Sequence, residues 1–302
     1  MSYWRSVLLV LAGACSYGVL SVIMKSAFSA GFTPVELSGG QLVFGTLIMS
    51  GVALFLSRQR FRLRHLLILL PSGLMMAGTS LFYHRAVSEI PASLAIVLLF
   101  QFTWIGVLIE CIADRKWPGP EKWASLVLLG IGTVLASGLM ESGLHDVSAT
   151  GLIYGLLSGF TFAMVIFLSG RLAPDVNPYL RSAVSIGMAA LCLSLVYPPT
   201  FLINGRLWDG LLPYALLVAC FGSAIPILCL SIGVPRIGNG LATILSAAEL
   251  PAVVLLSSLV LHEQVSLYKW SGVLLILAAI AVPQIKWNRL VHPARKPHRH
   301  KM

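Results

Sequence analysis

The sequence predicts an all-α integral membrane protein with ten transmembrane helices, arranged as an inverted repeat of two five-helix halves. The first observation is composition: the 302 residues are 57% hydrophobic and 11% charged, with a mean hydropathy of +0.88. Soluble domains average about 25% charged residues. The second observation is that apolar stretches of about 20 residues, long enough to cross a bilayer, recur along the whole chain. The third is a short sequence pattern that occurs twice.

The apolar stretches are separated by short polar loops, which defines the expected spans. Their approximate ranges are 4–26, 34–56, 66–87, 91–112, 123–140, 149–170, 179–200, 210–233, 238–260 and 268–285. The stretch 123–140 is short for a span by itself. Its correspondence with the span that follows Lys269-Trp270 supports it.

The repeated pattern relates the two halves of the chain at an offset of 147 residues. Ser93-Leu94-Ala95-Ile96 and Lys122-Trp123 correspond to Gly240-Leu241-Ala242-Thr243 and Lys269-Trp270. Five spans is an odd number, so the second half must enter the membrane from the opposite side, which predicts an inverted repeat. We therefore expect a first five-helix half at 1–145, a second, inverted half at 146–286 and a basic cytoplasmic tail at 287–302.

The net charge of +10 is distributed unequally across the expected membrane. With a cytoplasmic N-terminus, only Lys25, Arg85, Arg206 and Lys269 fall outside, and the other 17 of the 21 Lys and Arg residues fall inside. This bias predicts a multi-pass protein of the cell (inner) membrane, with both termini cytoplasmic and anionic lipid at that face. Nucleic-acid binding is not expected, because no segment is long enough to form a soluble basic face.

Motifs for cofactors and metals are absent from the sequence. No Gly-x-x-x-x-Gly-Lys-Ser/Thr string exists, which argues against a built-in ATPase of the common type. The five cysteines form no CxxC pair. Three tail histidines, His292, His298 and His300, could contact a metal, but a solvated basic tail is the preferred interpretation. We therefore expect no cofactor and no metal site.

Several motifs resemble a known family. Two five-span halves and three motifs resemble the EamA-type units of the drug/metabolite transporter superfamily. The motifs are Gly-Asn-Gly-Leu-Ala at 238–242, Glu249-Leu250-Pro251 and His262-Glu263-Gln264-Val265. The resemblance covers nearly all of the chain and is strongest over 236–283. It implies a ten-helix carrier of small metabolites, often an exporter and often coupled to protons.

The first half departs from the pattern of that family. Over 85–138, Trp104 stands where the family commonly has a proline, and Lys116 stands where it has a glutamate. The resemblance therefore implies that the fourth span has a different role or a different substrate contact from the ninth.

Glu249 is the main candidate for function, because it lies about 11 residues into its span, roughly 16 Å along a helix. This depth is near the centre of a hydrocarbon core about 30 Å thick. Pro251 removes a backbone donor and is expected to break the helix by freeing the carbonyl of Ala247. A carboxylate there can bind a cationic group of the substrate or carry a coupling proton. The alternative is a packing carboxylate bonded to a neighbouring helix.

Further substrate-binding candidates lie at similar depth in other spans. Gln101, Phe102 and Trp104 lie in the fourth span, where the offset aligns Phe102 with Glu249. Trp104 could stack on a planar or cationic substrate and Gln101 could orient it by hydrogen bonding. Tyr17, near the middle of the first span, could line the same cavity. Ordinary packing is the alternative for each.

Gate candidates and packing positions complete the sequence-based expectations. Tyr83-His84-Arg85 at the outer end of the third span are gate candidates, with an interfacial aromatic belt and a snorkelling arginine as the alternative. Gly151, Gly155 and Gly159 share one face of the sixth span and predict close approach of another helix.

The predicted function is a secondary transporter of small polar metabolites, such as amino acids or related compounds, in the export direction. Transport would proceed by alternating access around a midplane cavity, with optional proton coupling. The expected partners are a small-molecule substrate and the lipid bilayer, and the protein would be a monomer or homodimer. The alternative is a channel or structural membrane protein. A membrane-embedded enzyme is least favoured, because the spans hold only isolated ionisable residues.

Overall fold

The structure is a computed structural model, which describes residues 2–57, 59, 62–90, 92–137, 148–260 and 265–291. The described part of the chain is helical and holds no strand. The α-helices are α1 (Tyr3–Ser29), α2 (Pro34–Leu56), α3 (Leu63–Glu89), α4 (Ala92–Leu99), α5 (Phe102–Asp114), α6 (Pro120–Ala136), α8 (Ala149–Arg171), α9 (Pro178–Val196), α10 (Leu212–Ala219), α11 (Ile225–Ile237), α12 (Asn239–Ser246), α13 (Glu249–Val260) and α14 (Leu267–Val291). Short turns η1 (Thr200–Leu202), η2 (Leu207–Leu211) and η3 (Cys220–Ala224) join them.

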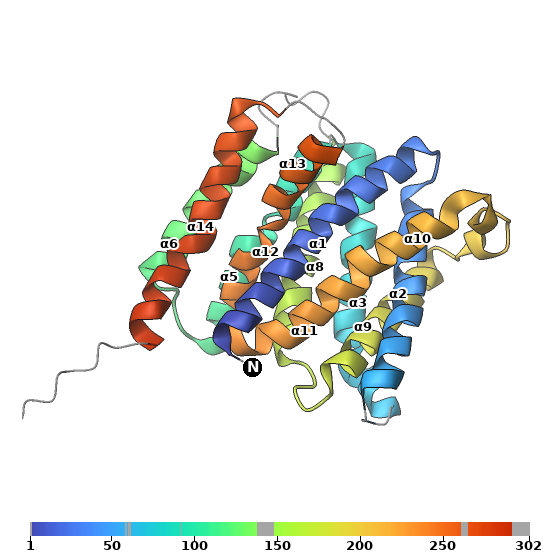
Figure 1. Cartoon of the computed structure of the whole chain (residues 1–302), viewed down its shortest axis with the longest axis horizontal. Helices are drawn as coiled ribbons and strands as arrows, with labels where there is room; N and C mark the ends of the chain where they lie inside the picture. The colour runs from blue at the N-terminus through green and yellow to red at the C-terminus, as the bar shows by residue number, and fades with distance from the viewer. Residues whose placement is uncertain are drawn as a thin grey trace, which may run out of the picture.

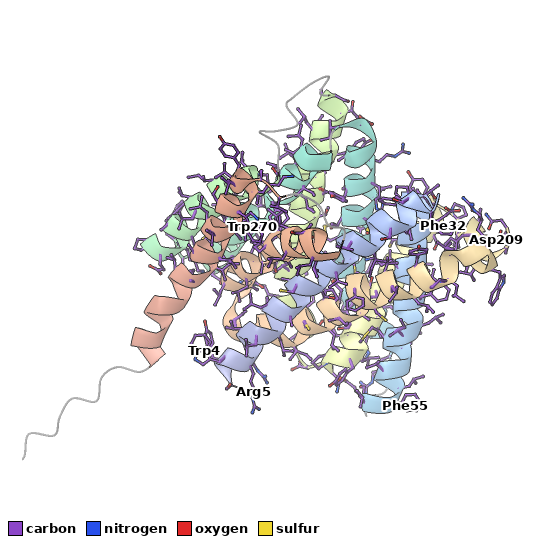
Figure 2. All side chains as sticks on the ribbon, turned by 45° about the horizontal axis from the view of Figure 1, so that its top comes forward. Trp4, Arg5, Phe32, Phe55, Asp209 and Trp270 are labelled. Atoms are coloured by element: carbon purple, nitrogen blue, oxygen red, sulfur yellow. The ribbon has the colours of Figure 1, made fainter. Side chains whose placement is uncertain are left out.

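Among the described residues, eight candidate membrane spans are long and apolar enough to cross a bilayer, and Leu267–Pro283 is a shorter apolar helix. The surface of the bundle is also apolar. Leu54 is 83% exposed, Phe55 91% and Leu195 78%. Figure 2 shows Trp4 and Phe55 at one end of the bundle and Phe32 with Asp209 toward the other. Large exposed apolar side chains of this kind suit a lipid environment, so the chain is a multi-pass membrane protein.

The starts of α2, α8 and α9 are capped by polar side chains. The α2 start has a capping box, in which the Thr33 N–H donates to Glu36 Oε2 at 2.8 Å and the Glu36 N–H donates to Thr33 Oγ1 at 3.3 Å. The Ser148 hydroxyl accepts from the Gly151 N–H at the start of α8. These caps satisfy N–H groups that have no partner within the helix and none in lipid.

Helices distant in sequence pack together. Figure 1 shows α6 and α14 side by side at one edge of the bundle. Their contact is close, because a Cβ on Gly132 would lie 2.8 Å from Ile276 Cγ1, and the Ser125 hydroxyl donates to the Ala279 carbonyl. In the rest of the bundle, α1 packs against α11, α12 and α13, whereas α8 packs against α3, α4 and α5.

The repeated Lys-Trp pair lies in the first turns of α6 and α14. In α6, Lys122 Nζ lies 2.7 Å from Glu110 Oε2 of α5, so this ion pair fastens the two consecutive helices together. The pair is partly shielded from solvent, which makes it stronger than a fully exposed ion pair.

Two expected spans, 91–112 and 238–260, are interrupted rather than continuous. The first is broken at Phe100-Gln101, between α4 and α5, and the second at Ala247-Ala248, between α12 and α13. The two breaks are again 147 residues apart. Because Trp104 occupies the position that corresponds to Pro251, proline is not required for the break in the first half.

Both breaks contain a shortened hydrogen bond at corresponding positions. The Gln101 N–H donates to the Leu98 carbonyl at 3.2 Å, and the Ala248 N–H donates to the Leu245 carbonyl at 3.1 Å. Each bond spans three residues instead of the four of an α-helix, which tightens the turn and ends the regular helix. The Ala247 carbonyl, which was expected to be free, accepts the Leu250 N–H at 3.3 Å.

The Gln101 side chain closes the first break. In a continuous helix the Val97 carbonyl would accept the Gln101 N–H, which is instead used on Leu98. The Gln101 side-chain Nε2 takes its place and donates to the Val97 carbonyl at 2.8 Å. The indole N–H of Trp104 donates to Gln101 Oε1 at 2.7 Å and holds the amide in place.

The glycine face of α8 packs on this first break. A Cβ on Gly155 would lie 2.6 Å from Leu98 Cδ1, and a Cβ on Gly159 would lie 2.8 Å from the Leu98 oxygen and 2.9 Å from the Leu99 oxygen. The close approach predicted from the small residues is confirmed, and it is made to interrupted backbone.

Gly159→Ala should destabilise the fold, because its Cβ would press on two backbone oxygens that cannot move independently. Overpacking of this kind typically costs about 1–3 kcal/mol. The measurement is the melting temperature of the purified protein in detergent. Gly130→Ala is the control, since a Cβ there meets nothing within 4 Å. Equal melting temperatures for the two variants would contradict the packing described above.

Gln101→Leu should also lower stability, because it leaves the Val97 carbonyl and the Trp104 indole N–H without their partners. Polar groups that lose their hydrogen-bond partner where water cannot replace it cost about 1–3 kcal/mol each. Trp104→Phe removes only the second bond and should have the smaller effect in the same thermal measurement. If Gln101→Leu kept the wild-type melting temperature and weakened only substrate binding, Gln101 would be a ligand residue and not a closure of the break.

Candidate functional site

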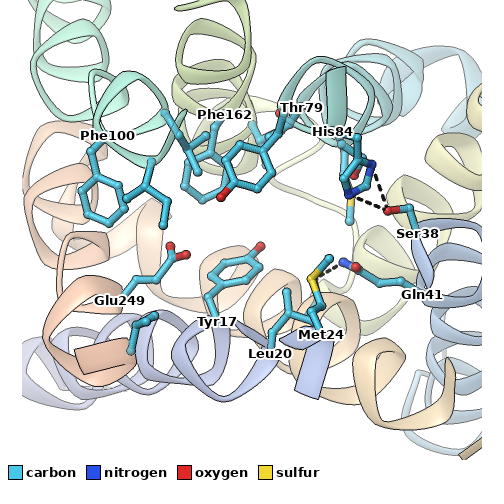
Figure 3. A pocket seen from close by; sticks show the side chains of 18 of the residues that line it. Tyr17, Leu20, Met24, Ser38, Gln41, Thr79, His84, Phe100, Phe162 and Glu249 are labelled. Atoms are coloured by element: carbon cyan, nitrogen blue, oxygen red, sulfur yellow. Dashed lines mark hydrogen bonds between the residues drawn. The ribbon is translucent and has the colours of Figure 1, made fainter. Parts of the chain in front are cut away.

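A cavity of about 150 Å³ lies inside the bundle, where α1, α2, α3, α8, α11 and α13 meet the break between α4 and α5. Figure 3 shows its side chains converging from opposite sides. Aromatic rings from Tyr17, Tyr83, Phe100 and Phe162 form much of its wall. The site is therefore an apolar chamber with a few polar groups, as is typical of small-molecule sites.

Glu249 supplies the only carboxylate among the described residues that line this cavity, and the described lining holds no Lys or Arg. Its carboxylate points into the cavity, toward Tyr17 (Figure 3). None of the ion pairs within the described part of the chain includes it. Because the helix restarts after the break, Glu249 is the first residue of α13, where the helix dipole favours a negative charge.

The aromatic wall is a chain of ring contacts. Tyr17 and Phe162 meet edge to face with centroids 5.8 Å apart, and Phe162 meets Phe102 in the same way at 4.8 Å. Phe102 also packs on Phe100, at 5.4 Å. Phe102 is fully buried and is not part of the lining. It supports the rings that face the cavity instead of facing the cavity itself.

A polar corner of the cavity is built on the π-helical turn η3. The Gln41 side-chain amide donates to the Gly222 carbonyl at 2.8 Å, and the Ser16 hydroxyl donates to the Phe221 carbonyl at 2.7 Å. A π turn shifts the regular hydrogen-bond pattern and occurs often at functional sites. The two side chains from α1 and α2 thus satisfy carbonyls of η3 and anchor both helices beside the cavity.

The gate candidates separate into two groups. Tyr83 and His84 line the cavity. Arg85 does not; its guanidinium carbon lies 5.9 Å from the centroid of the Tyr197 ring, and it lines a second cavity of about 270 Å³. Ser38 and His84 line both cavities, with the Ser38 hydroxyl 3.1 Å from His84 Nε2 (Figure 3). This hydrogen bond therefore lies at the division between the two chambers.

The structure brings together Glu249, Tyr17, Tyr83 and His84 of the residues that the sequence singled out. It does not bring Gln101 or Trp104 to the cavity lining, and Trp104 is 43% exposed. By the sequence offset, these two side chains lie at about the same membrane depth as Glu249. They project from a face of their helix that does not meet the cavity.

Several lining residues were not among the candidates, including Ser38, Gln41, Thr79, Phe100 and Phe162. Gln41 carried a usable signal, because a polar amide within an apolar span needs a partner or a function. The two phenylalanines carried none, since apolar rings in a membrane helix are ordinary. Among the described residues, no group of three His, Cys, Asp or Glu side chains could hold a metal ion.

Comparison with known proteins identifies the family. The family model described as the EamA-like transporter family matches residues 4–138 and 149–282. A crystal structure of another protein superposes with a TM-score of 0.79 at 17% identity, over 96% of this chain and 99% of that chain. At this identity the likeness concerns the fold alone. The comparison with curated proteins finds no match. Since the two matched segments together span most of the chain, this membrane protein belongs to the EamA-like transporter family.

Proposed function

We propose that this protein is a secondary transporter that moves small metabolites with a cationic amino group, such as amino acids or related compounds, through the cavity around Glu249. The observation that carries the proposal is the single carboxylate in an otherwise uncharged, aromatic-walled chamber within the described bundle. A carboxylate that faces an apolar cavity without a counter-ion is unfavourable, so binding of a proton or a cationic group is strongly favoured there.

The wall of the cavity supports the same class of substrate. Ring faces attract a cation within about 6 Å through the ring quadrupole. Rings also offer apolar contact to the body of an amine, and the cavity volume of about 150 Å³ suits a small molecule. An amino group at Glu249 with an apolar or aromatic body among Tyr17, Phe100 and Phe162 satisfies both features.

Alternating access is the proposed mechanism, with ten helices as an inverted repeat of halves 1–145 and 146–286. Two observations support it. The helix breaks at Phe100-Gln101 and Ala247-Ala248 are related by the same offset of 147 residues as the sequence repeat. The packing of α1 on α12 and α13 is also mirrored by that of α8 on α4 and α5. Such reciprocal packing allows one half to rock against the other around a fixed site.

The orientation that we propose has both termini in the cytoplasm, in the cell (inner) membrane, with anionic lipid and the basic tail 287–302 at that face. The distribution of Lys and Arg supports it. In this orientation the Ser38–His84 hydrogen bond lies toward the outside, where it would form part of an outer gate. Export is the proposed net direction, driven by exchange against protons at Glu249, and the transporter would act as a monomer or homodimer.

Glu249→Gln should abolish saturable uptake of a small amine or amino acid into proteoliposomes, because the amide removes the charge that attracts the cation. We expect a loss of at least about tenfold in transport efficiency, equivalent to about 1.4 kcal/mol. Asp209→Asn is the matched control, since Asp209 is an exposed carboxylate outside the cavity.

Two outcomes of this uptake experiment would count against the proposal. Wild-type rates in Glu249→Gln would remove the carboxylate from the mechanism. Flux that rises with substrate concentration without saturation, in the wild type, would favour a channel over a carrier.

Proton exchange at Glu249 gives a second prediction. A cationic substrate and a proton compete for one carboxylate, so substrate affinity should fall as pH is lowered. Adding substrate to weakly buffered protein should release up to about one proton per molecule. A pH-sensitive dye measures the release in the wild type and in Asp209→Asn, and Glu249→Gln should release none. Proton coupling at this residue would be contradicted if substrate bound without releasing protons at a pH where the substrate affinity changes with pH.

A further inference from the structure

Arg181, in the first turns of α9, carries a buried positive charge that the proposed mechanism does not use. The residue is only 3% exposed. Its Nη2 donates to the Ser231 carbonyl of α11. Its Nη1 lies 3.4 Å from the Leu172 carbonyl and 3.5 Å from the Ala173 carbonyl, at the end of α8. The guanidinium thus contacts α11 and the two residues that follow α8, and each of these contacts is to a backbone carbonyl.

The charge of Arg181 is not neutralised by a carboxylate. None of the ion pairs in the described ranges includes it. Its Nε is buried and makes no hydrogen bond. The two Nη1 contacts are at the long limit of hydrogen bonding. A buried arginine with a free donor and no counter-ion is expensive, particularly within a membrane protein.

Capping of α8 explains only part of this arrangement. The Leu172 and Ala173 carbonyls lie where α8 ends, and a cation near a helix C-terminus is favourable. Nη1 alone would supply that interaction. The unused Nε and the absence of a carboxylate are left unexplained, and both point to an anion that binds at another stage.

A small chamber of about 10 Å³ adjoins Arg181. Hydroxyl groups share its lining with the guanidinium; they belong to Ser72, Ser169, Ser185 and Ser231. This chamber is large enough for about one water molecule. The Ser169 hydroxyl already donates to the Ile166 carbonyl at 2.7 Å, and the Ser182 hydroxyl donates to Ser231 Oγ at 3.0 Å. The guanidinium, with the hydroxyls of Ser72, Ser185 and Ser231 beside it, is chemically suited to an oxyanion.

The chamber lies next to the Glu249 cavity. Met76, Val165 and Ile227 line both spaces, so these three apolar side chains form the partition between them. In the proposed orientation the Arg181 chamber is on the cytoplasmic side of this partition. A substrate that passes between the Glu249 cavity and the cytoplasm would therefore meet Arg181.

We infer that Arg181 binds the carboxylate of the substrate on the cytoplasmic part of the transport path. This inference rests on the proposed transport through the Glu249 cavity and narrows its substrate class to zwitterions of the amino-acid type. When the partition opens, the weak contacts to Leu172 and Ala173 are exchanged for a bidentate carboxylate, whose geometry matches the guanidinium fork. Glu249 recognises the amino group and Arg181 the carboxylate.

The test compares amino acids with their decarboxylated amines in proteoliposomes, using phenylalanine with phenethylamine, leucine with isopentylamine, and lysine with cadaverine. Arg181→Gln should reduce uptake of the amino acids by at least about tenfold and leave the amines within about twofold of wild type. Arg181→Lys, which keeps the charge but loses the fork, should give an intermediate loss for the amino acids alone. Arg171→Gln, at an exposed arginine that pairs with Asp114, is the matched control.

Stability is measured alongside transport, so that a folding defect is not mistaken for lost recognition. If Arg181→Gln does not fold, the comparison is made with Arg181→Lys. Equal losses for amino acids and amines would assign Arg181 a purely structural role and overturn the inference. Failure of every amino acid to bind or to be transported would overturn it as well.

A free anion is the other source of the same chemistry. If replacing chloride by gluconate reduced uptake of both substrate classes in the wild type but not in Arg181→Gln, the site would hold an inorganic anion, and the carboxylate assignment would be wrong. Glu249→Gln separates this inference from the proposed function, because it should reduce uptake of amines and amino acids together. Loss in that variant with no class preference at Arg181 would leave the proposed transport intact.

Discussion

The structure depends on one constraint: a backbone polar group in a membrane has no water to bind, so the protein must supply every partner itself. Continuous helices meet this constraint without help. The breaks at Phe100-Gln101 and Ala247-Ala248, and the π turn η3, do not, and all three lie around the same cavity. Irregular backbone is tolerated there because side chains from other helices or from the next turn complete it, as Gln101, Gln41 and Ser16 do.

The same constraint makes the two breaks chemically different although they occupy corresponding positions. In the first, an amide and an indole close the opened turn, and the glycine face of α8 packs on its carbonyls. In the second, Pro251 follows the break and Glu249 begins the new helix, with its carboxylate in the cavity. A duplicated backbone feature is thereby used for packing on one side and for a charged group on the other. The asymmetry of the proposed site arises from side chains and not from the course of the chain.

Charge is the second organising feature of the interior. Glu249 and Arg181 are a carboxylate and a guanidinium in neighbouring chambers, separated by Met76, Val165 and Ile227 and not paired with each other. Two opposite charges kept apart in a low-dielectric interior favour a ligand that carries both complementary groups. The proposals for the two residues therefore describe one transport path. On this path a zwitterionic substrate binds both residues, which form no ion pair with each other.

Sequence alone determined the membrane class, most of the apolar spans and the family resemblance, because hydropathy and short motifs are local properties of the chain. It also singled out Glu249, since an ionisable side chain deep in an apolar span is rare enough to be informative.

Only the tertiary structure decided which neighbours each span has and which face of each helix meets the cavity. Hydropathy does not distinguish the face of a membrane helix that meets an apolar cavity wall from the face that meets lipid, because both are apolar. For this reason Trp104 and Phe102 were grouped with Glu249 by depth, whereas rotation of their helix places one at the exposed surface and the other behind the aromatic wall. The buried Arg181 beside a chamber shared by α3, α8, α9 and α11 likewise arises from contacts between distant segments, which local sequence does not encode.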